Sequence, residues 1–327
     1  MGILLLTKVV FCVMIGFFGA IMLGVILIPL FKKYNIKQTI SIFVKQHESK
    51  NGIPTMGGLI FILPTIISLF ILIIFKKISF NQELGMALFV FIGYSLIGFI
   101  DDMISIKSHK NEGLTVNMKL FLQVLLSLCF FYFYLKNGGT TRLESTLLHF
   151  KIEMGWFYGV FILFVLVGSS NAVNLTDGLD GLAGGLAAIA FISYSLVAFI
   201  MGFQSLGLFI ILLVGSLIGF LFFNVNPAKI FMGDAGSLSL GALMGVVAIL
   251  THKELTLFGV AFLFVVETLS VIIQTIWLIL FKKKLFLMTP LHHHFEKLGY
   301  SESDIVKVFW IIGLSLTMLG IYYGVWL

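Results

Sequence analysis

The densest group of reactive side chains lies mid-chain, in the segment NAVNLTDGLDGLAGG at residues 171–185. It holds two carboxylates, Asp177 and Asp180, and two amides, Asn171 and Asn174, between strongly apolar runs. A charge near the hydrocarbon region of a membrane costs about 3 kcal/mol or more unless it faces a cavity or a partner. Helix capping before the next apolar run would explain one aspartate but not both. The pattern therefore indicates a functional site.

A second acidic group, Asp101 and Asp102, directly follows the apolar run FIGYSLIGFI. Two adjacent carboxylates can bind a divalent cation or raise one pKa by repulsion. We expect the helix to end here, where its macrodipole disfavours anions unless a cation offsets them. The alternative is a solvated pair at the membrane exit that Lys107 or Lys110 neutralises.

A third segment, FNVNPAKIFMGDAGS at residues 223–237, combines a turn with a carboxylate and an aromatic ring. Asp234 is predicted either to ligate a metal ion or to cap the following helix. Phe231 is placed to stack on a flat ring.

Two further segments carry groups suited to anions. Lys50 and Thr55, in KNGIPTMGG, precede a helix start that favours negative charge, although a simple interfacial lysine is the alternative. Three successive histidines, His292, His293 and His294, cannot all face one point, so a three-histidine zinc site is not expected. They are interpreted as proton carriers or phosphate donors.

The elements that position these groups are transmembrane helices. The chain has 327 residues, of which 59% are hydrophobic and 11% charged, with a mean hydropathy of +1.10. Repeated apolar runs of about 20 residues indicate an all-α polytopic integral membrane protein, whereas a barrel would show alternating runs of about 10. We predict one domain over residues 1–327, with spans near 11–31, 56–75, 84–100, 119–136, 156–172, 181–201, 206–223, 237–251, 255–281 and 305–326.

Ten spans place both termini on the same side, and the lysines orient them. The loops joining spans 1–2, 3–4, 5–6, 7–8 and 9–10 carry Lys32, Lys33, Lys37, Lys45, Lys50, Lys107, Lys110, Lys119, Lys229, Lys282, Lys283, Lys284 and Lys297. The opposite side carries the smaller set Lys8, Lys76, Lys77, Lys136, Arg142, Lys151 and Lys253. The excess predicts that the first set is cytoplasmic and both termini are extracytoplasmic.

This orientation brings all five polar segments to a cleft on the cytoplasmic face. Carboxylates without cysteine ligands suit a hard cation such as Mg²⁺, and Mg²⁺ with lysines and histidines suits phosphoryl transfer. The chain contains no phosphate-binding loop or dinucleotide-binding fingerprint. The net charge of +6 comes from lysines in the loops. In a membrane protein such lysines indicate the orientation of the chain and anionic ligands, so no nucleic-acid partner is expected. Glu267, inside an apolar run, marks either a helix break or a buried pair.

The segments PTMGG (54–58), GFIDD (98–102), NAVNLTDGLDGLA (171–183), FMGDAGS (231–237) and TPLHHHFE (289–296) resemble the signatures of one family. They look like those of the phospho-N-acetylmuramoyl-pentapeptide transferases (MraY translocases), within the polyprenyl-phosphate N-acetylhexosamine-1-phosphate transferase superfamily. The PTMGG and HHHFE segments favour this branch over the GlcNAc-1-phosphate branch.

The resemblance implies a bacterial plasma-membrane enzyme that moves phospho-MurNAc-pentapeptide from UDP-MurNAc-pentapeptide to undecaprenyl phosphate. The products would be lipid I and UMP, and Mg²⁺ would be required. A homodimer is also implied by the resemblance.

Carried over by position, Asp234 would bind the Mg²⁺. Asp101 would deprotonate the lipid phosphate or act as a nucleophile in a two-step scheme. Asp102 would support Asp101 or help to hold the metal. The remaining implied contacts to the nucleotide, metal and sugar region are Lys50, Thr55, Asn174, Asp177, Asp180, Asn224, Phe231, His292, His293 and His294.

One position departs from the family pattern, which has a lysine three residues after the second aspartate. Here that position is Ser105, so either Lys107 or Lys119 would supply the charge, or phosphate binding would be weaker. Two other functions compete with this interpretation. A GlcNAc-1-phosphate transferase would share the aspartates but use UDP-GlcNAc. A lipid or solute transporter would instead place its polar groups near the membrane midplane, often in two repeated halves.

Overall fold

The computed structural model describes residues 2–37, 50, 52–108, 113–145 and 149–326. Within this part of the chain, eight helices are long and apolar enough to cross a membrane, and two apolar helices are shorter. The eight are α1 (Ile3–Lys33), α3 (Gln82–Ser108), α4 (Val116–Lys136), α5 (Phe157–Thr176), α6 (Leu182–Ile200), α7 (Gln204–Asn224), α10 (Phe262–Phe281) and α12 (Glu302–Ile321). The shorter two are α2 (Gly58–Ile74) and α8 (Asp234–Leu250).

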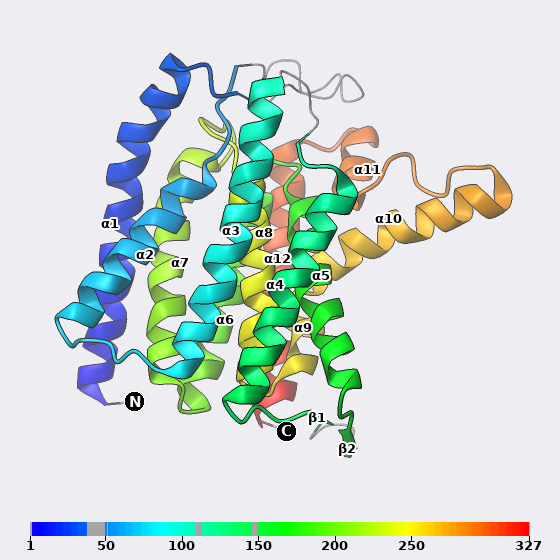
Figure 1. The fold of residues 1–327 in the computed structure, drawn as a ribbon. Helices are drawn as coiled ribbons and strands as arrows, with labels where there is room; N and C mark the ends of the chain where they lie inside the picture. Colours follow the sequence, from blue (N-terminus) through cyan, green and yellow to red (C-terminus); the bar gives the residue numbers. More distant parts are fainter. Residues whose placement is uncertain (1, 38–49, 51, 109–112, 146–148, 327) are drawn as a thin grey trace.

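The remaining elements are small. They are α9 (Leu257–Val260), α11 (Leu291–Lys297), a 3₁₀ turn at Glu254–Thr256, a π turn at Tyr322–Trp326, and strands β1 (Arg142–Ser145) and β2 (Phe150–Glu153). The strands pair antiparallel, with Arg142 opposite Glu153, and form a hairpin between α4 and α5. Both termini lie at one end of the bundle (Figure 1).

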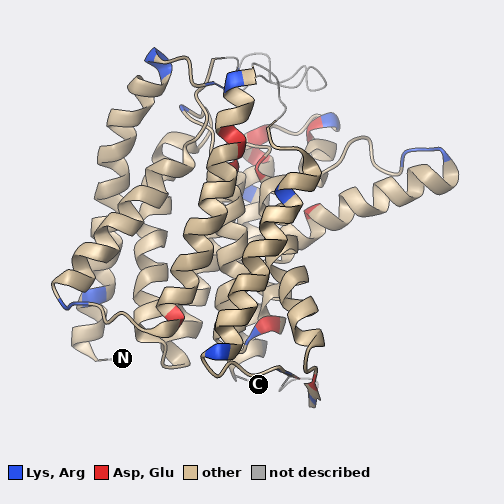
Figure 2. Cartoon of the chain, in the orientation of Figure 1, with Lys and Arg blue, Asp and Glu red and all other residues tan. Residues whose placement is uncertain are grey.

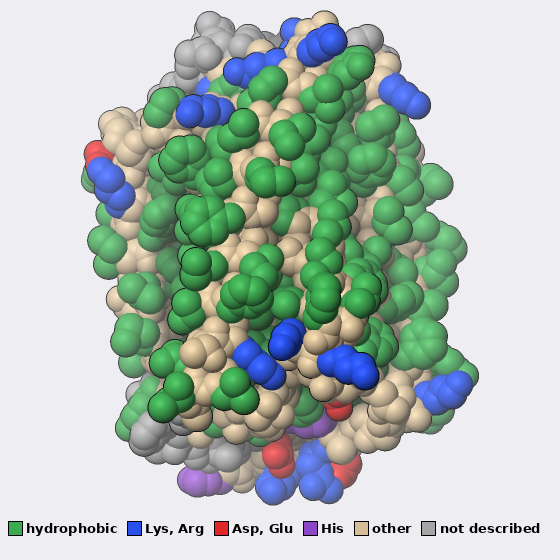
Figure 3. Space-filling view, turned by 90° about the vertical axis from the view of Figure 1, so that its left-hand side faces the viewer, with side chains coloured by type: hydrophobic (Ala, Val, Ile, Leu, Met, Phe, Trp, Pro, Cys, Tyr) green, Lys and Arg blue, Asp and Glu red, His purple; other side chains and the backbone are tan. Residues whose placement is uncertain are grey.

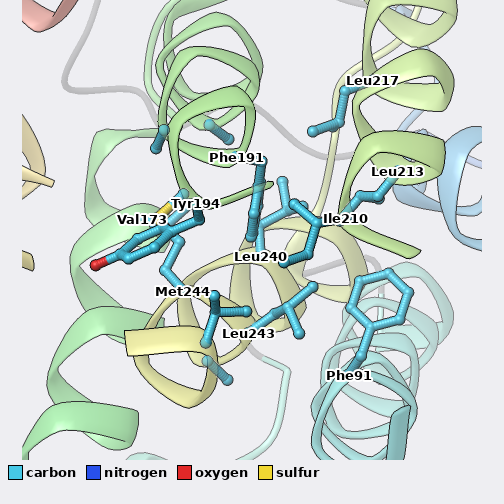
Figure 4. Packing of buried hydrophobic residues seen from close by; sticks show 14 of the residues in the cluster. Phe91, Val173, Phe191, Tyr194, Ile210, Leu213, Leu217, Leu240, Leu243 and Met244 are labelled. Atoms are coloured by element: carbon cyan, nitrogen blue, oxygen red, sulfur yellow. The ribbon is translucent and has the colours of Figure 1, made fainter. Parts of the chain in front are cut away.

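Helix α8 lies at the centre of the bundle, and each of its residues after Asp234 is buried. It packs between α3 and α5, while α7 packs against α1 and α6. Figure 4 shows the resulting core, in which Leu240 and Leu243 of α8 meet side chains such as Phe91, Phe191 and Ile210. Because the helix that begins with Asp234 is enclosed on several sides, the position of this carboxylate is set by the core.

The outer surface is apolar over most of its height. Side chains such as Phe18 and Met22 of α1 are exposed, at 59% and 69%. In Figure 3 a hydrophobic belt separates lysine and arginine side chains near the top from others in the lower part of the face. A belt of this kind matches the hydrocarbon core of a bilayer and its two interfaces. The chain is a multi-pass membrane protein.

Two predicted boundaries are wrong in ways that affect the site. The third helix does not end at Asp101 but continues to Ser108, so the acidic pair lies inside the helix and the expected dipole penalty does not apply. The ninth span is interrupted at Ala261, where the backbone leaves helical geometry between α9 and α10. Helix α10 then leans away from the bundle (Figure 1). Glu267 lies six residues beyond this break, inside α10.

Candidate active site

A cavity of about 520 Å³ opens among α3, α4, α5 and the start of α8. Its lining includes Asp101, Asp102, Lys119, Asn174 and Asp234. A group of acidic positions lies at this end of the bundle, opposite both termini (Figure 2). With Thr55, which also lines the cavity, the structure therefore gathers four of the predicted polar segments around one space, although they are far apart in the sequence.

The Lys119 side chain joins the two central carboxylates. Its Nζ lies 2.5 Å from Oδ2 of Asp234 and 3.1 Å from Oδ1 of Asp101. Asp101 also accepts the backbone N–H of Leu114 at 3.0 Å. The ammonium offsets like charges that would otherwise face each other in a partly desolvated site. Of the two lysines considered for the missing family charge, Lys119 thus lies in the cavity, while Lys107 is exposed in the last turn of α3.

Asp102 makes different contacts from its neighbour Asp101. Its two oxygens accept the backbone N–H groups of Asp234 and Ala235, at 3.0 and 3.1 Å. These donors belong to the first turn of α8, where unpaired N–H groups and the helix dipole favour an anion. Asp102 therefore caps α8 from the neighbouring helix and fixes the backbone that carries Asp234. Lys110, one of the cations proposed to neutralise the pair, lies outside the described residues.

Asp234 is held from two further directions. Asn174 Nδ2 donates to Oδ1 of Asp234 at 2.8 Å and lies 2.9 Å from the Ser237 hydroxyl. Gly98 of α3 allows the close approach of α8, because a Cβ at this position would stand 2.1 Å from the Asp234 carbonyl oxygen. Gly233, not Asp234, occupies the N-cap position, so the capping interpretation of Asp234 is wrong.

The carboxylate oxygens in this cavity suit Mg²⁺, but they would fill only part of its coordination shell. Among the described residues no group of three His, Cys, Asp or Glu side chains is arranged to enclose a metal ion. Mg²⁺, however, usually takes one or two protein carboxylates and completes its shell with water and substrate phosphates. Asp234, with Asp101 beside it, offers such oxygens, and the positive charge of Lys119 already lies between them.

Asp177 and Asp180 lie in the turn between α5 and α6, not on one helix face. Asp177 is half-buried. Burial, and then the negative charges of Asp234 and Asp180, raise its pKa to about 7. The Asp177 carboxyl thus lies near enough to Asp234 and Asp180 to be affected by their charges, whereas Asp180 itself belongs to a second cluster.

This second cluster, which we call the Lys50 cluster, consists of Lys50, Asp180, Asn226 and Glu302. Lys50 Nζ lies 2.6 Å from both Asp180 Oδ1 and Glu302 Oε1. Asn226 donates to both carboxylates, at 3.2 and 2.9 Å. The cluster thereby ties together the segment before α2, the α5–α6 turn, the α7–α8 connection and the start of α12.

The aromatic ring of Phe231 lies beside this cluster, with Lys50 Nζ 5.9 Å from its centroid. That distance is within the range of a cation–π contact. The predicted partners Lys50, Asp180 and Phe231 are thus brought together by the fold.

Two other predicted site residues take different places. Asn224 is buried and satisfied internally, because its amide accepts the N–H of Gly181 and donates to the carbonyl of Ile230. It shapes the turn rather than lining the cavity. Thr55 does line the cavity, and its buried hydroxyl has no hydrogen-bond partner among the described residues.

The three histidines have three different environments, as their succession in the sequence predicts. His292 is fully buried beside Glu267. His293 Nδ1 lies 2.6 Å from Glu296 Oε2. His294 accepts the N–H of Leu287 at 3.1 Å.

Sequence reasoning missed Asn226 and Glu302 as members of the site. Asn226 lies in the segment FNVNPAKIFMGDAGS, which also contains the predicted site residues Phe231 and Asp234. Glu302 opens α12 after Ser301, a position typical of a favourable acidic first turn. Because a favourable place in the first turn already explains this acid, the sequence did not indicate that Glu302 also pairs with Lys50, which is distant in the sequence.

The comparisons with known proteins agree with this geometry. A family model described as glycosyl transferase family 4 matches residues 84–252, which include the acidic pair, the α5–α6 turn and Asp234. This match defines the class, a membrane-embedded phosphoglycosyl transferase. A second model, phospho-N-acetylmuramoyl-pentapeptide-transferase signature 1, matches residues 50–62.

Several relatives span nearly the whole chain. The phospho-N-acetylmuramoyl-pentapeptide-transferase of Geobacillus thermodenitrificans is 44% identical over 98% of both chains. The enzyme of the same name from Bacillus subtilis is 43% identical, again over 98% of both chains. That of Staphylococcus saprophyticus is 44% identical over 92% of this chain and 94% of its own. The chain belongs to the phospho-N-acetylmuramoyl-pentapeptide transferase family.

Proposed function

We propose that this protein transfers phospho-MurNAc-pentapeptide from UDP-MurNAc-pentapeptide to undecaprenyl phosphate, giving lipid I and UMP for peptidoglycan synthesis. The observation that supports this most directly is the Lys119 ammonium held between Asp101 and Asp234 in an open cavity. Phosphoryl transfer depends largely on neutralising and positioning charge, and this arrangement supplies both signs of charge at one place.

Asp101 is the residue that would accept a proton from the lipid phosphate. An oxygen of that phosphate then attacks the β-phosphorus of the nucleotide sugar, in line with the oxygen that bridges to the α-phosphate. The bond to the bridging oxygen breaks, and the electron pair leaves with UMP. Lys119, once released from the carboxylates, would lie near the phosphate oxygens that carry the charge.

Asp234, with Asp101 nearby, would hold the divalent metal ion that this class of transferase generally needs, and we propose Mg²⁺. When bound, Mg²⁺ would neutralise charge on the diphosphate. The chain's own contribution is to fix Asp234, through the capping contacts of Asp102 and the amide of Asn174.

The Lys50 cluster is proposed to receive the nucleotide. The Phe231 face would stack on the uracil ring, as aromatic rings do with other flat π-systems. Lys50 would meet the uridine-phosphate region, with Thr55 nearer the cavity, and Asp180 would define the pocket wall. His293 and His294 would lie toward the phosphate and sugar region.

We further propose a topology of ten spans in the bacterial plasma membrane, with the cavity on the cytoplasmic face and both termini outside. The lysine distribution supports this orientation. Both termini lie at the end of the bundle opposite the acidic group (Figures 1 and 2). Residues 1–327 are treated as one catalytic domain, and the implied homodimer remains a prediction.

The decisive assay is release of UMP by the purified full-length protein from UDP-MurNAc-pentapeptide in the presence of undecaprenyl phosphate, with and without MgCl₂. Magnesium-dependent UMP and lipid I are expected together. Asp234→Asn should lose transfer while expression and thermal stability stay close to wild type. Normal lipid I synthesis by Asp234→Asn, in magnesium without another metal, would contradict the assignment.

Two alternatives are separated by the same assay. Replacing the donor by UDP-GlcNAc tests the GlcNAc-1-phosphate transferase function, which would give product with UDP-GlcNAc instead. Asp101→Asn tests the chemistry. If this variant still exchanges UMP but forms no lipid product, a two-step route in which Asp101 is not the nucleophile is supported. Loss of both activities is expected both for direct attack and for Asp101 as nucleophile, and UMP exchange by the wild type without undecaprenyl phosphate distinguishes these two.

A further inference from the structure

Glu267 of α10 and His292 of α11 form a pair in which both side chains are fully buried. Oε1 of Glu267 accepts the backbone N–H of His292 at 3.1 Å. Oε2 lies 3.3 Å from Nδ1 of the imidazole, close to but short of a well-formed hydrogen bond. The carboxylate therefore holds both the backbone and one edge of the ring.

The other ring nitrogen of His292 faces the α5–α6 turn. A Cβ built on Gly178 would stand 2.2 Å from Nε2, so this ring edge lies directly beneath the partly exposed Gly178 backbone. Nε2 has no hydrogen-bond partner among the described residues. Leaving a buried polar atom unpaired costs about 1–3 kcal/mol, so we expect a bound ligand to pair with Nε2.

The buried charge of the pair decides whether Nε2 donates or accepts. A carboxylate without a neutralising partner is very costly in a fully buried place, so the pair is expected to be neutral overall. If Glu267 is ionised, His292 is an imidazolium and both ring nitrogens carry protons. If Glu267 is protonated, it donates to Nδ1 and the ring proton lies on Nε2. In both forms Nε2 is an N–H donor.

We propose that Glu267 is a positioning residue that acts through His292 and keeps an N–H donor under Gly178 for the diphosphate of the nucleotide sugar. This inference rests on the proposed function. Gly178 lies in the same turn as Asp180, which pairs with Lys50 in the Lys50 cluster. A small shift of the Gly178 backbone on substrate binding brings Nε2–H to an anionic oxygen.

The groups around the pair suit an anionic acceptor. The His293 ring packs against the His292 ring, with centroids 4.2 Å apart and planes tilted by 58°, and His293 pairs with Glu296. Among the described residues, Asp177 lies next to Gly178 in the sequence but forms no ion pair with His292, which pairs with Glu267. Lacking a carboxylate partner, the Nε2–H group remains available for a ligand.

Three substitutions distinguish a role of Glu267 in positioning His292 from a role in the stability of the fold alone. In Glu267→Gln the amide oxygen still accepts the His292 N–H, so its NH₂ group faces Nδ1 and Nε2 keeps its proton, but the pair can no longer become an ion pair. His292→Gln retains a donor near Nε2, whereas His292→Asn removes it. We expect kcat/KM for the nucleotide sugar to fall about 10-fold in Glu267→Gln and about 100-fold in His292→Asn, with His292→Gln between wild type and His292→Asn.

The double variant Glu267→Gln/His292→Asn gives the decisive comparison. If Glu267 acts through His292, the double variant is no worse than His292→Asn, while KM for undecaprenyl phosphate stays within about twofold of wild type. Losses that multiply would overturn the proposal. The matched control is Glu254→Gln, a buried glutamate near the other end of the bundle paired with Tyr158, whose effect should be independent of His292.

A spectroscopic measurement tests the pair without activity. In full-length protein labelled with ¹⁵N-histidine, the signal lost in His292→Gln reports His292, and it should show a protonated Nε2 that shifts when UDP is added. An unprotonated Nε2 would refute the inference even if transfer occurs. Absence of transfer by wild type, with Nε2 protonated and responsive to UDP, would instead count against the proposed function alone.

Discussion

Replacing Lys119 by methionine removes the charge between Asp101 and Asp234 and shortens the unbranched side chain by only one atom. The three side chains are 11–22% exposed, so the site is neither dry nor fully solvated. At an effective dielectric constant of about 20, one such ion pair at about 4 Å contributes roughly 4 kcal/mol of Coulomb energy. Desolvation and screening cancel much of this, because hydrogen bonds to charged groups contribute about 1.5–3 kcal/mol net.

We therefore expect Lys119→Met to lose about 2 kcal/mol of stability in magnesium-free buffer, seen as a fall of about 4 °C in the apparent melting temperature. Saturating MgCl₂ should recover most of this loss in Lys119→Met but stabilise the wild type less. The reason is that a metal ion in the wild type must first displace the Lys119 ammonium. Transfer by the variant should fall about 10- to 100-fold even in magnesium, because the phosphate oxygens lose a charged donor.

The assay is thermal unfolding of the purified protein in detergent across a magnesium titration, together with UMP release. Lys107→Met is the matched control, because Lys107 is exposed at the end of α3. Its melting temperature, magnesium response and transfer rate should resemble wild type. The reasoning is refuted if Lys119→Met responds to magnesium like the wild type, or if Lys107→Met loses as much transfer as Lys119→Met.

Three further predictions concern the support of the site. Gly98→Ala should lose transfer and at least about 1–3 kcal/mol of stability, since its Cβ would collide with the Asp234 carbonyl; Gly168→Ala, where a Cβ meets open space, is the control in the same assays. Asp102→Ala should leave two α8 N–H groups unpaired and lower stability by about 1–3 kcal/mol per group, a result that unchanged melting would contradict. The raised pKa of Asp177 means that the folded protein binds a proton more tightly than the unfolded chain. In magnesium-free buffer stability should fall as pH rises from about 4 to about 7 and then level off, and melting curves of Asp177→Asn should show a smaller decline over that window.

The sequence alone was sufficient for the class of fold and for most members of the site. Long apolar runs require helices because a backbone in lipid must satisfy its own hydrogen bonds, and this holds whatever the packing. Aspartates and asparagines such as Asp101 and Asn174 stood out because polar groups next to such runs need a reason to be there. The ordered motifs then indicated the family, which the relatives confirmed.

Only the tertiary structure decided which partners each of those residues contacts. Asp101 and Asp102 are adjacent in sequence, yet one faces Lys119 and the other caps α8, because neighbouring helical side chains point in directions about 100° apart. Likewise, Asp180 joins the Lys50 cluster, whereas Asp177, three residues earlier, is affected by burial and by the charge of Asp234. The choice of Lys119 over Lys107, and the pairing of Glu267 with His292, depend on helices that meet across long stretches of chain. Local patterns do not encode such contacts, since they arise from the packing of α3, α4, α8, α10 and α11.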